Sequence, residues 1–304
     1  DTLANVSESL RVGADMRFAQ PRASGLRLTE ATILFRRDAV IDAIGYYDGV
    51  RRAADSEFRL RLEAATGRPV PVVRVGAPLT LVRSRVESLS GGDFADQWMH
   101  PARVAYRSAM AHWLSGQLVA GRPARIDHPQ LERSFPAHAH LTGTAMSDAA
   151  FDVLVIGDTR VSGSFARDRI PELLEAASAH GVRVAVRRLE DIGRGGPRTA
   201  TAEPIQRLIS MGRVVEVLAT DDVDAHLLVV AGDRCLLGLG DRDLGIRTSL
   251  VYRVAEAEDE LSIVLDEALE RLVGTDAAAS AATVSWSTVL AAVARAERTP
   301  GPTA

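Results

Sequence analysis

The second half of the chain alternates apolar strands with helices, and this rhythm constrains the fold more than any other feature. Residues 151–156 form an apolar run that ends at Gly157, which is typical of a strand buried on both faces. Short glycine-marked turns separate the units that follow, which are a helix over 167–180, a strand over 182–186, a helix over 204–211, and strands over 214–218 and 225–230. We therefore predict a Rossmann-like, doubly wound parallel sheet.

The end of the chain changes in composition. A long helix is predicted over 256–273, and residues 275–304 are rich in alanine, serine and threonine. We expect this tail to be of low complexity and loosely held, with a short amphipathic helix over 284–296.

The first 120 residues have no regular period and many turn signals. An apolar stretch over 31–35 is predicted to be a strand, and helices are predicted over 39–44, ending at Gly45, and from Asp55 to Gly67. Further elements are predicted as strands over 71–75 and 77–82, a loop over 84–92 and a helix over 101–118. The predicted domains are residues 1–120, a connector over 121–150, an α/β domain over 151–274, and the tail over 275–304.

Composition excludes several functional classes. All 36 cationic side chains are arginine, so lysine Schiff bases, pyridoxal-phosphate lysines and Walker-type phosphate sites are excluded. The single cysteine excludes an intramolecular disulfide and a cysteine-based zinc site. The net charge is −4 and the arginines are scattered, which argues against a nucleic-acid surface. Without an apolar run of about 18 residues or a signal peptide, we expect a cytoplasmic protein with no transmembrane segment.

The stretch over 31–62, ATILFRRDAVIDAIGYYDGVRRAADSEFRLRL, carries the most specific pattern. A strand ending in an arginine pair precedes a short helix, a G-Y-Y-D turn over 45–48, and a carboxylate-bearing segment that starts at Asp55. This order resembles the acceptor-side half of the inverting family 2 glycosyltransferases, which have the GT-A fold. The family usually has glutamate before the aspartate, whereas this chain has Ala54.

The resemblance implies that Asp55 is the catalytic base. Inverting transfer is a single displacement, in which the acceptor hydroxyl must lose its proton as it attacks, so one nearby carboxylate suffices. A place in the first turn of a helix favours its ionised form. Glu57 and Arg61 are expected to bind the acceptor or to pair with each other, four residues apart. The alternative is that Asp55 only caps a helix and that Glu57 and Arg61 form a solvated ion pair.

The same resemblance assigns roles to residues further along. Trp98 and Trp113 could stack on a sugar, or both could be core residues. His100 could serve as a late ligand of the divalent metal, Mg²⁺ or Mn²⁺, that such enzymes use, although a lone histidine is more often structural. The D-x-D signature for this metal is absent before the stretch over 31–62, and the triplets that begin at Asp222 and Asp241 fall in the second domain, where turn or cap roles are expected.

The loop over 157–163 lies between a strand and a helix but lacks the G-x-G-x-x-G fingerprint. The layout of this domain resembles the amino-terminal half of the GT-B glycosyltransferases. Ligands of such sheets lie outside the carboxyl ends of the strands, so Asp158 and Arg160 are candidate substrate-binding residues. A domain that only packs, or only recognises a glycan, is the alternative.

These patterns together predict an incomplete GT-A-like module followed by a Rossmann-like domain. The predicted activity is transfer from a nucleotide-sugar donor to a glycan acceptor of the cell envelope or surface, in the cytoplasm or at the inner face of the membrane. Because the chain begins at Asp1 without a donor-binding half, we expect a fragment of a longer enzyme. The competing prediction is a non-catalytic glycan- or partner-binding scaffold. The sequence does not indicate an oligomeric state.

Overall fold

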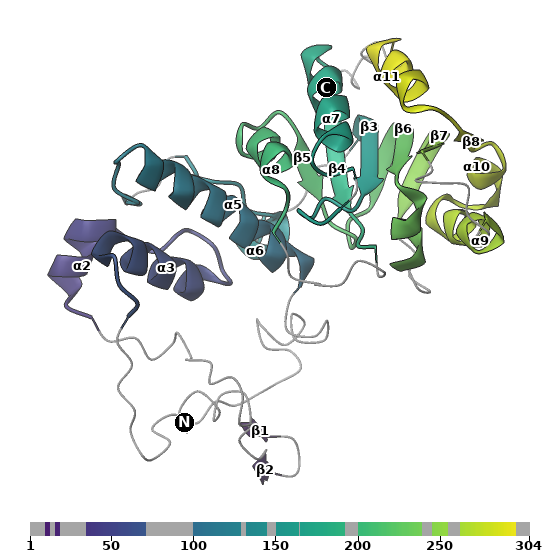
Figure 1. Ribbon diagram of the computed structural model, residues 1–304. Helices are drawn as coiled ribbons and strands as arrows, with labels where there is room; N and C mark the ends of the chain where they lie inside the picture. Colours follow the sequence, from purple (N-terminus) through teal and green to yellow (C-terminus); the bar gives the residue numbers. More distant parts are fainter. Residues whose placement is uncertain are drawn as a thin grey trace. The chain divides into compact units, whose positions relative to one another are not determined.

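The chain divides into two compact units in the computed structural model (Figure 1). One comprises Asp1–Arg103 and Trp113–Thr144, and the other comprises Val104–His112 and Ala145–Ala304. The structure describes residues 10–12, 16–18, 35–70, 100–128, 132–144, 150–163, 165–191, 200–238, 245–254 and 262–295. The predicted strands over 71–75 and 77–82, the predicted loop over 84–92 and residues 31–34 of the predicted strand over 31–35 lie outside the described residues.

The described residues of the first unit are mainly helical. Strands β1 (Leu10–Val12) and β2 (Met16–Phe18) form an antiparallel pair. The helices are α2 (Arg37–Ile44), α3 (Ala54–Thr66), α6 (Ala139–Thr142) and the ends of α5 (Pro101–Val119), whose middle belongs to the other unit. The predicted helices over 39–44, 55–67 and 101–118 are thus confirmed, although α2 starts before Asp38, with Arg36 at its N-cap.

Gly45 ends α2 because the chain passes close to another segment there. Its φ is 72°, and it forms a parallel bridge with Ile126. The Tyr46 N–H donates to the Ile126 carbonyl at 2.8 Å, and the Ile126 N–H donates to the Ile44 carbonyl at 3.0 Å. A Cβ atom at Gly45 would lie 1.9 Å from the Ile126 carbonyl oxygen, so only glycine fits. This contact fixes the turn that leads from α2 toward α3.

The second unit contains a six-stranded parallel sheet in the order β5-β4-β3-β6-β7-β8. The strands are β3 (Ala150–Gly157), β4 (Val184–Arg188), β5 (Val215–Val217), β6 (Val223–Ala231), β7 (Ile246–Val254) and β8 (Ala282–Thr283). From β3 the chain adds β4 and then β5 on one side of the sheet. It then returns to the other side of β3, where it adds β6, β7 and β8 in turn. This is the doubly wound, Rossmann-like order, and it places the topological switch point between β3 and β6.

Helices cover both faces of the sheet, as successive side chains of the central strands alternate between two cores. Val153 and Val155 of β3 pack in one core with residues of α7 (Arg169–Ala179), α8 (Glu203–Ser210) and α11 (Trp286–Arg295). Leu154 and Ile156 pack in the other with residues of α9 (Ser262–Val273) and the 3-10 helix η2 (Asp233–Gly238). Figure 1 shows this layered arrangement. The predicted strands and helices over 151–230 are confirmed.

Residues 275–295 differ from the predicted loose tail. They form α10 (Thr275–Ala279), β8, which pairs with β7, and α11. Val289 and Val293 lie one helical turn apart, are fully buried and belong to the core that contains α7. The predicted amphipathic helix over 284–296 is confirmed as α11. Two buried valines and the β7–β8 pairing hold this segment in the unit, although its composition alone suggests a loosely held tail.

The burial of α11 predicts that Val289→Ala destabilises the protein by about 2 kcal/mol, because the change removes two buried methyl groups and leaves a cavity. Denaturant unfolding followed by circular dichroism measures the loss. Thr288→Ala, on the exposed side of the same helix, serves as the control and is expected to cost under about 0.5 kcal/mol. Equal effects of the two changes would contradict the assignment of α11 to the core.

Candidate functional site

Asp55 lies in the first turn of α3, at an exposed position. The N-cap of this helix is Ala53, which has a φ of 69° and no side-chain cap, so Asp55 is a helical residue and not the cap. Its Oδ1 atom accepts one hydrogen bond, from the Ser56 N–H at 2.9 Å. The Asp55 side chain is exposed to solvent. Asp55 therefore retains acceptor capacity for a ligand hydroxyl.

Glu57 and Arg61 form the predicted pair, but the pair is buried and not solvated. Both side chains have 0% exposure. Arg61 donates from Nε and NH2 to the two carboxylate oxygens of Glu57, and also to the backbone carbonyls of Ile44 and, at 2.5 Å, Tyr46. Burial raises the pKa of the Glu57 carboxyl above its usual value, and the bond from Arg61 opposes that rise. The pair joins α3 to the end of α2 and lies away from solvent.

Aromatic rings lie in a row beside this pair. The rings of Phe35 and Phe58 are 5.2 Å apart, and Tyr47 stacks on Phe58 with ring centroids 4.0 Å apart and an angle of 12°. Phe58 is 1% exposed, whereas Tyr47 is 47% exposed. Burial raises the pKa of the Tyr47 phenol, and the charges of Asp55 and then Glu57 raise it further. Tyr47 thus packs on α3, the helix that carries Asp55.

His100 is the N-cap of α5, where its Nδ1 atom accepts from the Ala102 N–H at 3.1 Å. Its ring stacks on that of His140 at 3.8 Å, and the His140 Nε2 atom lies 2.6 Å from the Arg52 guanidinium. The described residues contain no group of three or more histidine, cysteine or acidic side chains that could hold a metal ion. His100 uses Nδ1 to cap the helix, and its expected role as a metal ligand stays a prediction. Trp98 lies outside the described residues, and Trp113 contacts Phe135 with ring centroids 5.2 Å apart.

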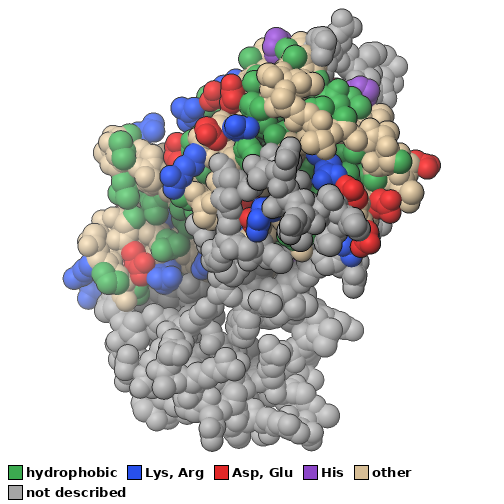
Figure 2. All heavy atoms as spheres, turned by 45° about the vertical axis from the view of Figure 1, so that its right-hand side comes forward, with side chains coloured by type: hydrophobic (Ala, Val, Ile, Leu, Met, Phe, Trp, Pro, Cys, Tyr) green, Lys and Arg blue, Asp and Glu red, His purple; other side chains and the backbone are tan. Residues whose placement is uncertain are grey.

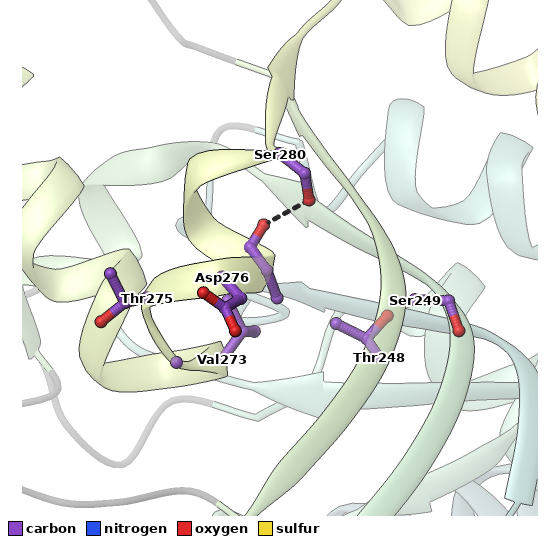
Figure 3. A pocket seen from close by; sticks show the side chains of 8 residues that line it. Thr248, Ser249, Val273, Thr275, Asp276 and Ser280 are labelled. Atoms are coloured by element: carbon purple, nitrogen blue, oxygen red, sulfur yellow. Dashed lines mark hydrogen bonds between the residues drawn. The ribbon is translucent and has the colours of Figure 1, made fainter.

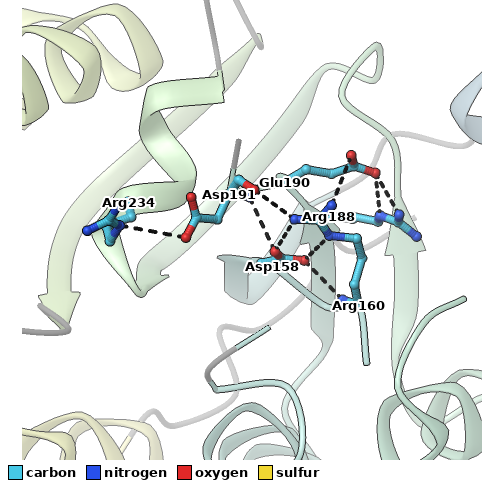
Figure 4. Close-up of polar contacts among 6 residues, drawn as sticks. All are labelled: Asp158, Arg160, Arg188, Glu190, Asp191 and Arg234. Atoms are coloured by element: carbon cyan, nitrogen blue, oxygen red, sulfur yellow. Dashed lines mark hydrogen bonds and ion pairs between the residues drawn. The ribbon is translucent and has the colours of Figure 1, made fainter. Parts of the chain in front are cut away.

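The second unit places Asp158 and Arg160 directly after β3, at the carboxyl edge of the sheet beside the switch point. Both are buried. Arg160 donates from Nε to Asp158 Oδ1 at 2.8 Å and from NH2 to Oδ2 at 2.5 Å, and its NH2 also reaches the Asp191 carbonyl at 2.8 Å (Figure 4). Bonding to Asp158 raises the pKa of Arg160. The guanidinium that could hold a phosphate is thus already occupied by a carboxylate.

Four further charged side chains extend this pair into a network. Glu190 lies 3.5 Å from Arg160 NH1 and accepts from Arg188 at 2.6 Å. Arg234, from η2 after β6, lies 3.7 Å from Asp191 Oδ2 (Figure 4). The three arginines Arg160, Arg188 and Arg234 balance the three carboxylates Asp158, Glu190 and Asp191. The network links residues that follow β3, β4 and β6, so it ties together the carboxyl ends of three neighbouring strands.

The aspartate triplets take structural places where they are described. Asp224 of β6 pairs with Arg247, its neighbour across the β6–β7 register, at an exposed position. The second triplet, at 241–243, lies outside the described residues. On strand β4, burial lowers the pKa of the Arg187 guanidinium to about 10, and this arginine donates to the Asp221 carbonyl at 2.6 Å.

A separate pocket of about 610 Å³ lies between β7 and the α9–α10 turn (Figure 3). Its lining is mostly small and polar, with the side chains of Thr248, Ser249, Thr275, Asp276 and Ser280. The Ser280 hydroxyl donates to the Ala277 carbonyl at 2.9 Å. The pocket is open, and no buried unpartnered polar atom among the described residues points to a particular ligand there.

The face in Figure 2 shows basic and acidic side chains interspersed over the described residues. None of the helices in the described ranges combines the length and hydropathy needed to cross a bilayer.

The chain was compared with protein-family models, with curated proteins and with solved structures. No family model matches it, and neither does a curated protein or a solved structure.

Sequence reasoning missed two sets of residues at these sites. Tyr47 was treated only as part of a turn, although an aromatic residue next to a carboxylate-bearing helix start is a signal for binding. Glu190 and Asp191 come four and five residues after the end of the predicted strand over 182–186. Their position at the carboxyl end of a parallel strand could have placed them beside Asp158.

The buried pair predicts that Arg61→Met lowers the free energy of unfolding by about 3–5 kcal/mol, because Glu57 is left buried without its partner. In this variant the folded-state pKa of Glu57 rises further above its unfolded value. The loss is therefore small below about pH 4.5, where the carboxyl is neutral in both states, and grows as pH rises. Urea unfolding across pH measures it. Arg59→Met is the matched control, because it breaks the half-buried Arg59–Glu63 pair of the same helix, and an equal loss would contradict the assignment.

The proximity of Asp55 and Tyr47 predicts that Asp55→Asn lowers the pKa of the Tyr47 phenol toward its usual value, because the neighbouring negative charge that disfavours the phenolate is removed. Ultraviolet titration of tyrosinate, with Tyr47→Phe subtracted, measures the change. Asp38→Asn, at an exposed position on α2, is the control. An unchanged Tyr47 titration in Asp55→Asn would show that the two groups do not interact.

Proposed function

We propose that the chain is the acceptor-side part of an inverting glycosyltransferase that transfers a sugar from a nucleotide-sugar donor to a glycan of the cell envelope or surface. In this proposal an incomplete GT-A-like module precedes a Rossmann-like domain that resembles half of a GT-B enzyme. The observation that supports it is the state of Asp55. Its carboxylate is exposed in the first turn of α3 and accepts a hydrogen bond from the Ser56 N–H. The exposed ring of Tyr47 stacks on Phe58, three residues further along the same helix.

The proposed reaction uses Asp55 as general base. An acceptor hydroxyl bonds to the Asp55 carboxylate and gives up its proton to it as the hydroxyl oxygen bonds to the anomeric carbon of the donor. The bond from that carbon to the diphosphate breaks at the same time, and the nucleoside diphosphate leaves with the electron pair. Because attack comes from the opposite face, the anomeric configuration inverts. The proton then passes from Asp55 to water.

The buried Glu57–Arg61 pair supports this role indirectly. It holds α3 against the Gly45–Tyr46 turn through the carbonyls of Ile44 and Tyr46, so the position of Asp55 is fixed by a rigid element. We assign Glu57 and Arg61 to positioning and not to contact with substrate, as both are fully buried. A divalent metal, Mg²⁺ or Mn²⁺, would neutralise the diphosphate, and the proposal takes its ligands from outside the described residues.

The second candidate function is a non-catalytic scaffold that binds a glycan or a partner. The observation that favours it is the network at the switch point, where Asp158 already occupies Arg160. Titration with uridine and guanosine diphosphate sugars, with and without Mn²⁺, separates the two functions. Metal-dependent binding argues against the scaffold.

We predict that Asp55→Asn lowers kcat for transfer by about 10²- to 10⁴-fold, which is the rate acceleration that a general base typically contributes. The Kd for the donor is expected to stay nearly unchanged. Transfer is measured with radiolabelled nucleotide sugars on the polypeptide as the genome encodes it. Asp42→Asn, which removes an exposed aspartate of α2, is the control and retains activity. Turnover by Asp55→Asn at the unaltered rate would overturn the role of Asp55.

A further inference from the structure

We propose that Tyr47 provides the surface on which the sugar ring of the acceptor stacks, next to Asp55. The inference rests on the proposed function and adds a specificity-determining residue to it. One face of the Tyr47 ring lies on Phe58, at 4.0 Å and 12°, and the side chain is nevertheless 47% exposed. A ring held flat on a buried neighbour, with its other side open, suits a ligand that brings a flat apolar face.

The support beneath Tyr47 is rigid on the side of α3. Phe58 is 1% exposed and also contacts Phe35, with ring centroids 5.2 Å apart. Arg61 lies 5.6 Å from the Phe58 ring centroid, where a guanidinium is attracted to the ring. Phe58 thus has little freedom to move away when a ligand presses on Tyr47. Because the ring is ordered before binding, stacking costs little conformational entropy.

The backbone on both sides of Tyr47 is also fixed. The Tyr46 carbonyl accepts from Arg61 at 2.5 Å, and the Tyr46 N–H donates to Ile126 at 2.8 Å. Asp48 on the other side is buried and pairs with Arg133. The backbone of the turn therefore holds the Tyr47 ring in a single orientation.

The charges near Tyr47 select the chemistry of the ligand. Asp55 is exposed and lies three residues before Phe58 in α3, so the two are neighbours on the helix surface. Tyr47 stacks on Phe58, and the charge of Asp55 raises the pKa of the Tyr47 phenol. A carboxylate and a phenol offer acceptors and a donor to neutral hydroxyl groups, whereas a phosphate or an acidic sugar would be repelled by Asp55. A neutral sugar combines the flat C–H face that Tyr47 suits with the hydroxyls that Asp55 accepts from. We therefore assign the site to a neutral pyranose or furanose ring.

Tyr46 offers a matched comparison on the same turn. It is 39% exposed, so its exposure resembles that of Tyr47. Its ring, however, contacts the ring of His128, with ring centroids 5.4 Å apart and an angle of 51° between the planes. Phe58 stacks on Tyr47 and not on Tyr46. If general exposed aromatic surface were sufficient for binding, the two tyrosines would contribute alike.

The test is binding of the whole chain to an array of neutral oligosaccharides, followed by titration of the best glycan. Tyr47→Ala is expected to weaken binding about ten-fold or more, Tyr47→Phe about three-fold or less because the ring remains, and Tyr46→Ala hardly at all. Thermal unfolding checks each variant. For the unaltered protein, nuclear Overhauser contacts between sugar C–H protons and the Tyr47 ring are expected, and they do not depend on the stability of any variant.

Three results would overturn the proposal. The first is equal binding by Tyr47→Ala and the unaltered chain, and the second is the absence of binding to every glycan of the array. The third is loss of uridine binding in Tyr47→Ala without loss of glycan binding, which would assign the ring to a nucleobase. Failure of the proposed function gives a different result from failure of this inference. If the protein is not a glycosyltransferase that uses Asp55, either no transfer is detected or Asp55→Asn leaves transfer intact. Glycan binding would still depend on Tyr47 in both cases.

Discussion

Buried guanidinium groups held by carboxylates organise both units of this protein. A charge moved out of water is costly unless it is paired and its remaining donors are satisfied. Arg61 meets this condition with Glu57 and two backbone carbonyls, and Arg160 meets it with Asp158 and the Asp191 carbonyl. A guanidinium offers five donors in a plane, so one side chain can bind a carboxylate and a carbonyl at once. A chain without lysine uses that geometry twice to join segments that are distant in sequence.

The two networks have different consequences for their surroundings. The Arg61 network is buried between α3 and the turn that follows α2. Asp55 on α3 and Tyr47 in that turn remain exposed. The Arg160 network lies at the carboxyl edge of the sheet, where a doubly wound fold offers its ligand crevice, and it satisfies its own charges there. The first unit thus leaves a carboxylate and a phenol exposed, whereas the second unit uses its switch point for internal ion pairs that tie β3, β4 and β6 together.

The sequence predicted the elements whose signals are local, and it failed where burial is decided by distant segments. β3, β4 and β6 were predicted because strands buried on both faces are continuous apolar runs. β7 was not predicted, because polar residues interrupt IRTSLVYRV and several of its positions are partly exposed. The spacing of Glu57 and Arg61 indicated a pair, but its burial depends on Ile44 and Tyr46, which the Gly45–Ile126 bridge fixes. The Asp158–Arg160 pair was missed as a pair since a spacing of two residues does not predict a contact.

The contrast between two aspartates shows which one the fold leaves available for chemistry. Asp158 accepts from the Arg160 N–H, from Arg160 Nε and NH2, and from the Asp191 N–H, so its two oxygens are engaged by four donors. A proton placed on that carboxylate would disrupt these bonds and leave a buried guanidinium without its counter-charge. Asp55 accepts one bond, from the adjacent Ser56 N–H, and is exposed. Taking up a proton there disrupts no network. A general base must gain and lose a proton in every cycle, so the carboxylate with the fewer internal bonds is the one suited to that role.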